Sequence, residues 1–196
     1  LHLEGGEQLR GAAVLNATGR SPNTQGIGLE SVGISVNKKG AIPVDADSRT
    51  SVEHIWAVGD VTDRVNLTPV AIAEGRAMVE SVFGNPPRRV DHSIVASAVF
   101  TDPPMATVGL TEAQAAEKGP IRVFESDFRP MKDDFVDGSS RSYMKLVVDA
   151  DTDKVLGAHM VGADAPEIIQ SLAVAVTCGA SKADFDRTIA VHPTAA

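Results

Sequence analysis

The chain has 196 residues, of which 43% are hydrophobic, so it can form one large or two small domains with a substantial core. Its formal net charge of −8, from 18 basic and 26 acidic residues, argues against non-specific binding to nucleic acid or to an anionic membrane. No apolar run approaches the roughly 20 residues of a membrane-spanning helix, and we expect a soluble, cytoplasmic protein without a nucleic-acid or membrane partner.

The first part of the chain carries short apolar runs separated by turn-forming residues. These runs predict strands at residues 1–3, 12–16, 41–44 and 54–58, and a short helix within residues 26–32. The run at 41–44 is expected to be an edge strand, because Pro43 has no N–H to donate to a neighbouring strand.

A long helix is predicted to begin at Thr68-Pro69 and to end near residue 83. Threonine is a good N-cap, and proline suits the first helical position because an N–H would be unpaired there anyway. The free N–H groups of such a terminus can stabilise an anion. Asp60 follows the predicted strand and can accept hydrogen bonds from sugar-like hydroxyls. The segment 57–76 is therefore predicted to hold a cofactor. The apolar positions expected to face the core are Val70, Ile72, Ala73, Ala77, Val79, Val82 and Phe83.

Residues 84–87, with the sequence GNPP, are predicted to separate two domains. Beyond them, strands are predicted at 96–100, 106–110, 121–128, 142–148 and 155–161. Helices are predicted at 111–118, with a Thr-x-x-Gln capping box, at 166–178, and at 181–186, with Ser181 as its cap. Strands followed by helices indicate an α+β domain with an antiparallel sheet.

The helix predicted at 166–178 is apolar over a wide arc and contains no lysine or arginine. It can be a core helix, or one of its sides can form a subunit interface, and the pattern leaves both interpretations open. Its last residue, Cys178, is the single cysteine of the chain. One cysteine excludes an intramolecular disulfide or a cysteine-rich metal site, so we expect no bound metal and a buried thiol that acts as a small apolar group.

Several motifs occur in a specific order along the chain. They are ATGR followed by SPN (17–23), AVGD (57–60), LTPVAIAEGR (67–76), VFTDPPMATVGLTE (99–112), KVLGAHMVG (154–162) and AVHPT (190–194). This set resembles the second half of the FAD-dependent pyridine nucleotide-disulfide oxidoreductases. TPVAIAEGR and KADFDRTIAVHPT are most similar to the glutathione reductase branch of that family.

The resemblance implies an α/β plus α+β fold: the C-terminal portion of a Rossmann-like FAD/NAD(P)-binding unit, followed by an α+β dimerisation domain with an antiparallel sheet. Residues 1–22 would end the NAD(P)-binding domain, residues 23–87 would form the C-terminal half of the FAD-binding domain, and residues 88–196 would form a dimerisation domain truncated at its C-terminus. The family's redox-active cysteine pair would precede Leu1. The chain alone is therefore expected to dimerise through residues 88–196 but not to reduce disulfides or to bind FAD tightly.

The resemblance also implies a flavin contact. Asp60 would hydrogen-bond the ribityl chain of FAD, and Leu67, Thr68 and Pro69 would place a helix N-terminus against the pyrimidine side of the isoalloxazine. A helix N-terminus suits that edge because the reduced flavin carries negative charge there. The alternative is that Gly59-Asp60 is a plain turn.

Substrate and catalytic residues follow from the same resemblance. Arg76 would bind glutathione disulfide through a carboxylate, and Met131 would line the second glutathione position from the partner subunit. His192 would reach the other subunit's flavin and exchange protons with the thiols as acid and base. For Arg76 the alternatives are a solvated helix arginine or an ion pair with Glu80, one helical turn further on.

The activity implied for the intact enzyme is reduction of glutathione disulfide, with electrons passing from NADPH to FAD, to the cysteine pair and then to the substrate. One alternative is a non-catalytic dimerisation module. Another is a different disulfide reductase of the family, such as trypanothione reductase, dihydrolipoamide dehydrogenase or mercuric reductase.

Overall fold

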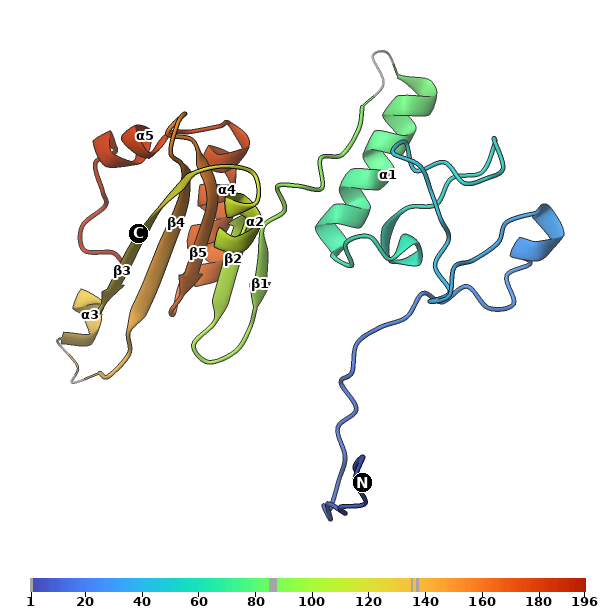
Figure 1. The fold of residues 1–196 in the computed structure, drawn as a ribbon, viewed down its shortest axis with the longest axis horizontal. Coiled ribbons are helices and arrows are strands. Elements are labelled where there is room, and N and C mark those ends of the chain that lie inside the picture. The colour runs from blue at the N-terminus through green and yellow to red at the C-terminus, as the bar shows by residue number, and fades with distance from the viewer. Residues whose placement is uncertain (1, 85–87, 135, 137) are drawn as a thin grey trace. The chain divides into compact units, whose positions relative to one another are not determined.

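The computed structural model describes residues 2–84, 88–134, 136 and 138–196. The chain divides into two compact units, Leu1–Val90 and Asp91–Ala196 (Figure 1). Residues 85–87, which include most of the predicted GNPP boundary, lie outside the described residues. The predicted domain limits at residues 22 and 87 stay predictions.

The first unit is built from turns and one long helix. It contains the 3-10 helices η1 (Leu29–Val32) and η2 (Gly59–Thr62), followed by α1 (Thr68–Phe83). Its described part has no β-strand, only the isolated bridges His2↔Gln8 and Arg49↔Trp56. The predictions of strands at 12–16, 41–44 and 54–58 are therefore wrong. The predicted strand at 1–3 is also wrong for residues 2 and 3, which the structure describes.

The missing strands have a physical explanation. Residues 2–20 are exposed throughout, so no buried face fixes the register of a strand there. The runs at 41–44 and 54–58 still make a few backbone bonds. Ile42 N–H donates to the Val61 carbonyl at 2.9 Å, and the run at 54–58 bonds to residues 48–50 through Ala57 N–H to the Ser48 carbonyl and Thr50 N–H to the Ile55 carbonyl, both at 3.0 Å. A run of such bonds to a neighbouring segment is needed for a strand, and it does not form.

The core of the first unit is small. Its buried members are Ile34, Ile42 and Ala57, with Leu29, Val44, Val52, Ile55 and Val61 packed against them. Helix α1 buries Val70, Glu74 and Ala77. Four of its residues that were predicted to face the core are exposed, namely Ile72, Val79, Val82 and Phe83. The apolar side chains of α1 therefore spread over a larger part of the helix surface than the described residues cover.

The second unit is a five-stranded antiparallel sheet with helices, as predicted. Its strands are β1 (Ser97–Val99), β2 (Met105–Gly109), β3 (Ile121–Phe128), β4 (Ser142–Asp149) and β5 (Val155–Val161), in the spatial order β1-β2-β5-β4-β3. The helices are α2 (Glu112–Ala116), α3 (Met131–Asp134), α4 (Ala165–Thr177) and α5 (Lys182–Arg187). Figure 1 shows α4 lying along the sheet, where it contacts β1, β2 and β5.

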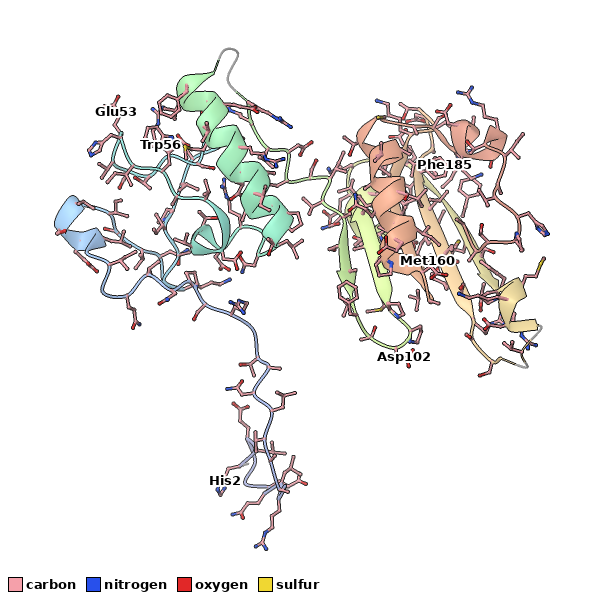
Figure 2. All side chains as sticks on the ribbon, turned by 180° about the vertical axis from the view of Figure 1, so that it is seen from behind. His2, Glu53, Trp56, Asp102, Met160 and Phe185 are labelled. Atoms are coloured by element: carbon pink, nitrogen blue, oxygen red, sulfur yellow. The ribbon has the colours of Figure 1, made fainter. Side chains whose placement is uncertain are left out.

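One large apolar cluster holds α4 on the sheet. Its buried members are Ala106, Val108, Val148, Val155, Ala158, Met160, Ala165, Ile169 and Val176. Met160 and Phe185, both labelled in Figure 2, contribute from β5 and α5. The opposite side of α4 carries Val174, which is 63% exposed, and Cys178 at its end is also exposed. The expectation that Cys178 is buried is therefore wrong, because the helix turns that position away from the sheet.

Local signals in this unit are confirmed at their predicted places. The Thr111 side chain accepts from the Gln114 N–H while the Gln114 side chain accepts from the Thr111 N–H, which is a complete capping box at the start of α2. Ser181 and Asp184 form the same box at the start of α5. Each box satisfies two N–H groups that the first helical turn leaves unpaired.

The face of the sheet opposite α4 carries a polar row across four strands. Thr107, His159, Lys145 and Glu125 are register partners on β2, β5, β4 and β3. His159 Nε2 lies 3.1 Å from the Leu110 carbonyl and therefore donates to it, which leaves Nδ1 to accept from the Thr107 hydroxyl at 2.6 Å. Burial lowers the pKa of His159, and the positive charge of Lys145 lowers it further.

This histidine predicts a pH-dependent stability. Its folded pKa lies below its ordinary value of about 6.5, so the unfolded chain binds a proton first and stability falls as the pH drops below 6.5. The slope from one such proton cannot exceed about 1.4 kcal/mol per pH unit. Chemical denaturation followed by circular dichroism between pH 7.5 and 5.5 measures it. In His159→Gln, which keeps a donor for Leu110 but does not titrate, this part of the slope should disappear, and an unchanged slope would contradict the assignment.

Candidate functional site

The Gly59-Asp60 turn lies directly on helix α1. Gly59 has φ +74°, and a Cβ added there would come within 2.9 Å of the Ala71 Cβ, so the turn requires glycine. The Thr62 hydroxyl donates to the Gly59 carbonyl at 2.8 Å, and the Asp63 N–H donates to the Asp60 carbonyl at 3.1 Å. These two hydrogen bonds hold the turn in shape, and its contact with the helix is at Ala71.

The side chain of Asp60 projects from this turn and meets no partner in the part of the chain that the structure describes. It is exposed, and among the described residues it has no hydrogen bond or ion pair. The neighbouring Asp63 differs, since a hydrogen bond from Asn66 and the ammonium of Lys39 hold the pKa of Asp63 below its usual range. The Asp60 carboxylate is therefore an acceptor that no described residue occupies, held on a hydrogen-bonded turn.

The N-terminus of α1 is uncapped. Leu67, in an extended conformation, is the N-cap, and no side chain of the described residues caps the first turn. Thr68 is the first helical residue and Pro69 the second, so the prediction that Thr68 is the N-cap is wrong by one position. The Val70 and Ala71 N–H groups both bond to the Leu67 carbonyl. In the described part of the chain the Thr68 hydroxyl has no partner. This exposed terminus can donate to a ligand and stabilise negative charge.

Arg76 lies two turns further along α1 and is exposed. One of the two alternatives, an ion pair with Glu80, does not form, and Glu80 pairs with Arg88 at 3.6 Å instead. No other ion pair of Arg76 occurs within the described ranges. Its guanidinium is therefore available to an anionic ligand.

Glu74 is a buried residue that sequence reasoning missed. It is 2% exposed, it accepts the Gly59 N–H at 2.6 Å, and it pairs with Arg64 at 2.9 Å. A signal was present, because Glu74 stands four residues after Val70 and three before Ala77, on the buried face of α1. A carboxylate on such a face is usually paired.

The other two predicted site residues lie in the second unit. Met131 begins α3 and is exposed, and it lines a pocket of about 300 Å³ with Ile168, Pro193 and Thr194. His192 precedes that proline in an exposed loop after α5, where the Thr194 hydroxyl donates to the Val191 carbonyl at 2.6 Å. The structure thus brings Met131 close to the motif that contains His192. The roles of all these residues stay predictions.

Among the residues described, no group of three or more His, Cys, Asp or Glu side chains could hold a metal ion. In the same part of the chain, none of the helices combines the length and apolar character needed to cross a membrane.

Two family descriptions match the chain. Residues 95–196 match the dimerisation domain of pyridine nucleotide-disulphide oxidoreductases, and residues 1–75 match the pyridine nucleotide-disulphide oxidoreductase family. Among solved structures, the HOCl-induced flavoprotein disulfide reductase RclA from Escherichia coli superimposes with a TM-score of 0.82 and 31% identity, over 91% of this chain and 42% of that one.

Curated relatives include enzymes named glutathione reductase. The chain is 55% identical to the chloroplastic/mitochondrial glutathione reductase of Pisum sativum and 50% identical to the glutathione reductase of Burkholderia cepacia. These alignments cover 93% and 100% of this chain but only 33% and 44% of the relatives. Trypanothione reductase from Trypanosoma congolense is 43% identical over 99% of this chain and 40% of its own length.

Proposed function

Because this chain belongs to the pyridine nucleotide-disulphide oxidoreductase family, we propose that it supplies part of the flavin site and the dimerisation domain of a glutathione-disulfide reductase. The protein that contains it would use FAD and NADPH. The observation that carries the proposal is a set of three groups on one segment of 17 residues, 60–76, that have no partner among the described residues. These are the Asp60 carboxylate, the uncapped N-terminus of α1 and the Arg76 guanidinium.

The residues present fit a flavin. A carboxylate that no described residue occupies, held on a hydrogen-bonded turn, can accept hydrogen bonds from the hydroxyls of a ribityl chain. At the helix terminus formed by Leu67, Thr68 and Pro69, the Thr68 N–H and hydroxyl offer donors, and the terminus offers partial positive charge, to an electron-rich ring edge. FAD, when bound, would supply the transfer of electrons from a nicotinamide to a disulfide. This chain's contribution would be to bind and orient it.

In this proposal, three other residues bind the substrate or transfer protons. Arg76 would bind a carboxylate of glutathione disulfide by a bidentate, charge-assisted pair. Met131 would line the second glutathione position. His192 would exchange protons with the thiols, since an imidazole titrates near neutral pH. Residues 88–196 would form the homodimer, with His192 serving the partner subunit's site.

Two other functions remain as alternatives. A non-catalytic dimerisation module would use the same sheet and α4 without any flavin. A trypanothione-type reductase is the second alternative, because relatives of that name are 43% and 45% identical to this chain. Relatives named glutathione reductase are more similar, at 50% to 55% identity. Sedimentation of the purified chain together with an FAD titration separates the module from the flavoprotein. Location in the cytoplasm is also part of the proposal, although one relative is named as chloroplastic/mitochondrial.

Arg76→Ala tests the substrate assignment in the protein that contains this chain. Loss of one charge-assisted contact, worth about 1.5 to 3 kcal/mol, should raise KM for glutathione disulfide roughly 10- to 100-fold and change kcat little. Initial rates of NADPH oxidation measure both constants. Arg88→Ala is the matched control, because Arg88 is also exposed but pairs with Glu80. An unchanged KM in Arg76→Ala would count against glutathione disulfide as the substrate.

A further inference from the structure

The buried carboxylate of Glu74 links the Asp60 turn to helix α1. Its two oxygens have different partners: Oε2 accepts the Gly59 N–H at 2.6 Å, and Oε1 pairs with Arg64 Nη2 at 2.9 Å. The hydrogen bond from Gly59 is charge-assisted, which makes it stronger than a neutral one, and the contact with Arg64 is an ion pair. At 2% exposure, Glu74 has little access to water that could replace either partner.

Each partner of Glu74 holds a further part of the turn. Gly59 is the residue directly before Asp60, and its carbonyl is fixed by the Thr62 hydroxyl at 2.8 Å. Arg64 follows the turn and also donates to the Ser48 hydroxyl at 2.9 Å. Glu74 thus contacts the chain at Gly59, immediately before Asp60, and at Arg64, shortly after it. Both contacts connect this segment to α1, the helix that carries Thr68 and Arg76.

We propose that Glu74 is a positioning residue, whose carboxylate ties the Gly59-Asp60 turn and Arg64 to α1 and thereby sets the Asp60 carboxylate relative to the uncapped first turn of that helix. The significance of Asp60 and Thr68 as flavin contacts rests on the proposed function. The attachment itself does not depend on a bound flavin, so it can be measured in this chain alone.

Amide hydrogen exchange of the flavin-free chain, followed by NMR, tests the proposal. Glu74→Leu keeps the volume of the side chain and removes both bonds, so exchange at the Gly59 amide should accelerate at least 10-fold while central α1 amides such as Ala77 keep their protection. Glu74→Gln retains an oxygen that can accept the Gly59 N–H and should stay within threefold of wild type. Glu80→Gln, on an exposed part of the same helix, should leave the Gly59 amide unchanged.

Three results would overturn the proposal. One is a Gly59 exchange rate in Glu74→Leu within threefold of wild type. Another is equal acceleration at Gly59 and along α1, which would make Glu74 a general stabiliser of the unit. The third is a Glu74→Gln effect as large as that of Glu74→Leu. If Glu74→Leu does not fold, exchange rates of the wild-type chain test the proposal. A Gly59 amide that exchanges as slowly as the Ala77 amide supports the attachment. A Gly59 amide that exchanges at the rate of an unstructured peptide overturns it.

A flavin titration of the same samples keeps the two proposals distinguishable. If the protein that contains this chain binds no FAD, the proposed function fails while the exchange result for Glu74 still stands. If FAD binds but Gly59 exchange does not respond to Glu74→Leu, the positioning role fails and the proposed function is unaffected.

Discussion

Replacing Gly157 with alanine should destabilise the second unit by about 3 kcal/mol. A Cβ at this position would lie 2.1 Å from the Leu110 carbonyl oxygen and 3.1 Å from His159 Nε2. Gly157 is on the central strand β5, paired with Gly109 on one side and Val147 on the other, so the backbone cannot move without disturbing both ladders. Overpacking in such places typically costs 1 to 3 kcal/mol, and a clash with backbone falls at the upper end. Chemical denaturation followed by circular dichroism measures the loss.

Gly119→Ala is the matched control for this prediction. Gly119 lies between α2 and β3, and an added Cβ would meet nothing within 4 Å. Its substitution should change the free energy of unfolding by no more than about 0.5 kcal/mol. If Gly157→Ala proved equally neutral, the close packing of the β2–α2 connection on β5 would be incorrect.

Ile169→Ala should cost the second unit about 2 to 5 kcal/mol. Ile169 is 2% exposed in the middle of α4 and packs into the cluster that joins this helix to the sheet. Truncation removes apolar burial and leaves a cavity that the surrounding strands can only partly fill. The shift in denaturation midpoint at constant slope gives the value.

Val174→Ala, on the exposed side of the same helix, is the control that distinguishes a core position of α4 from a surface position. It should leave the unfolding of the isolated second unit within about 0.5 kcal/mol of wild type. A large loss at both positions, measured where the chain is monomeric, would mean that α4 is buried on both sides. If Val174→Ala instead weakens self-association in sedimentation, this supports the interpretation that this side of α4 is a subunit interface.

The second unit could be predicted from sequence almost completely. In the strands β2 to β5, apolar residues either alternate with polar ones or follow one another in a run. The helices α2 and α5 each begin with a capping box, which specifies the first residue of the helix. Such signals are local, and here they agree with the tertiary packing. The exception is α3, a single turn at Met131–Asp134, which is too short to produce a periodic pattern.

The first unit shows where sequence patterns are insufficient. The run at 54–58 has a strand composition, but a strand also needs a continuous ladder with a neighbour, and the described chain provides only the Arg49↔Trp56 bridge. Similarly, α1 was correctly placed, whereas Ile72 and Phe83 are exposed because composition does not reveal which part of an apolar arc is covered. The predicted fold class itself, an α/β fragment followed by an α+β dimerisation domain, is confirmed by the family matches and the sheet.

The candidate site divides in the same way. Asp60, Thr68 and Arg76 are candidates because they lie in ordered motifs, which carry family information that no single residue has. Glu74 lies within one of those motifs, yet its role appears only when the Gly59 N–H and the Arg64 guanidinium are seen to meet it. A contact between residues 15 apart along the chain depends on the path of the intervening turn, and that path is not encoded in a periodic pattern.

Glutathione disulfide-dependent oxidation of NADPH, measured with the protein that contains this chain, tests the central proposal most directly. The account predicts a saturable rate with glutathione disulfide, a visible flavin spectrum in the purified protein, and a clear preference for this substrate over trypanothione disulfide. A flavin-free protein, or a flavoprotein that reduces trypanothione disulfide or lipoamide in preference to glutathione disulfide, would contradict it.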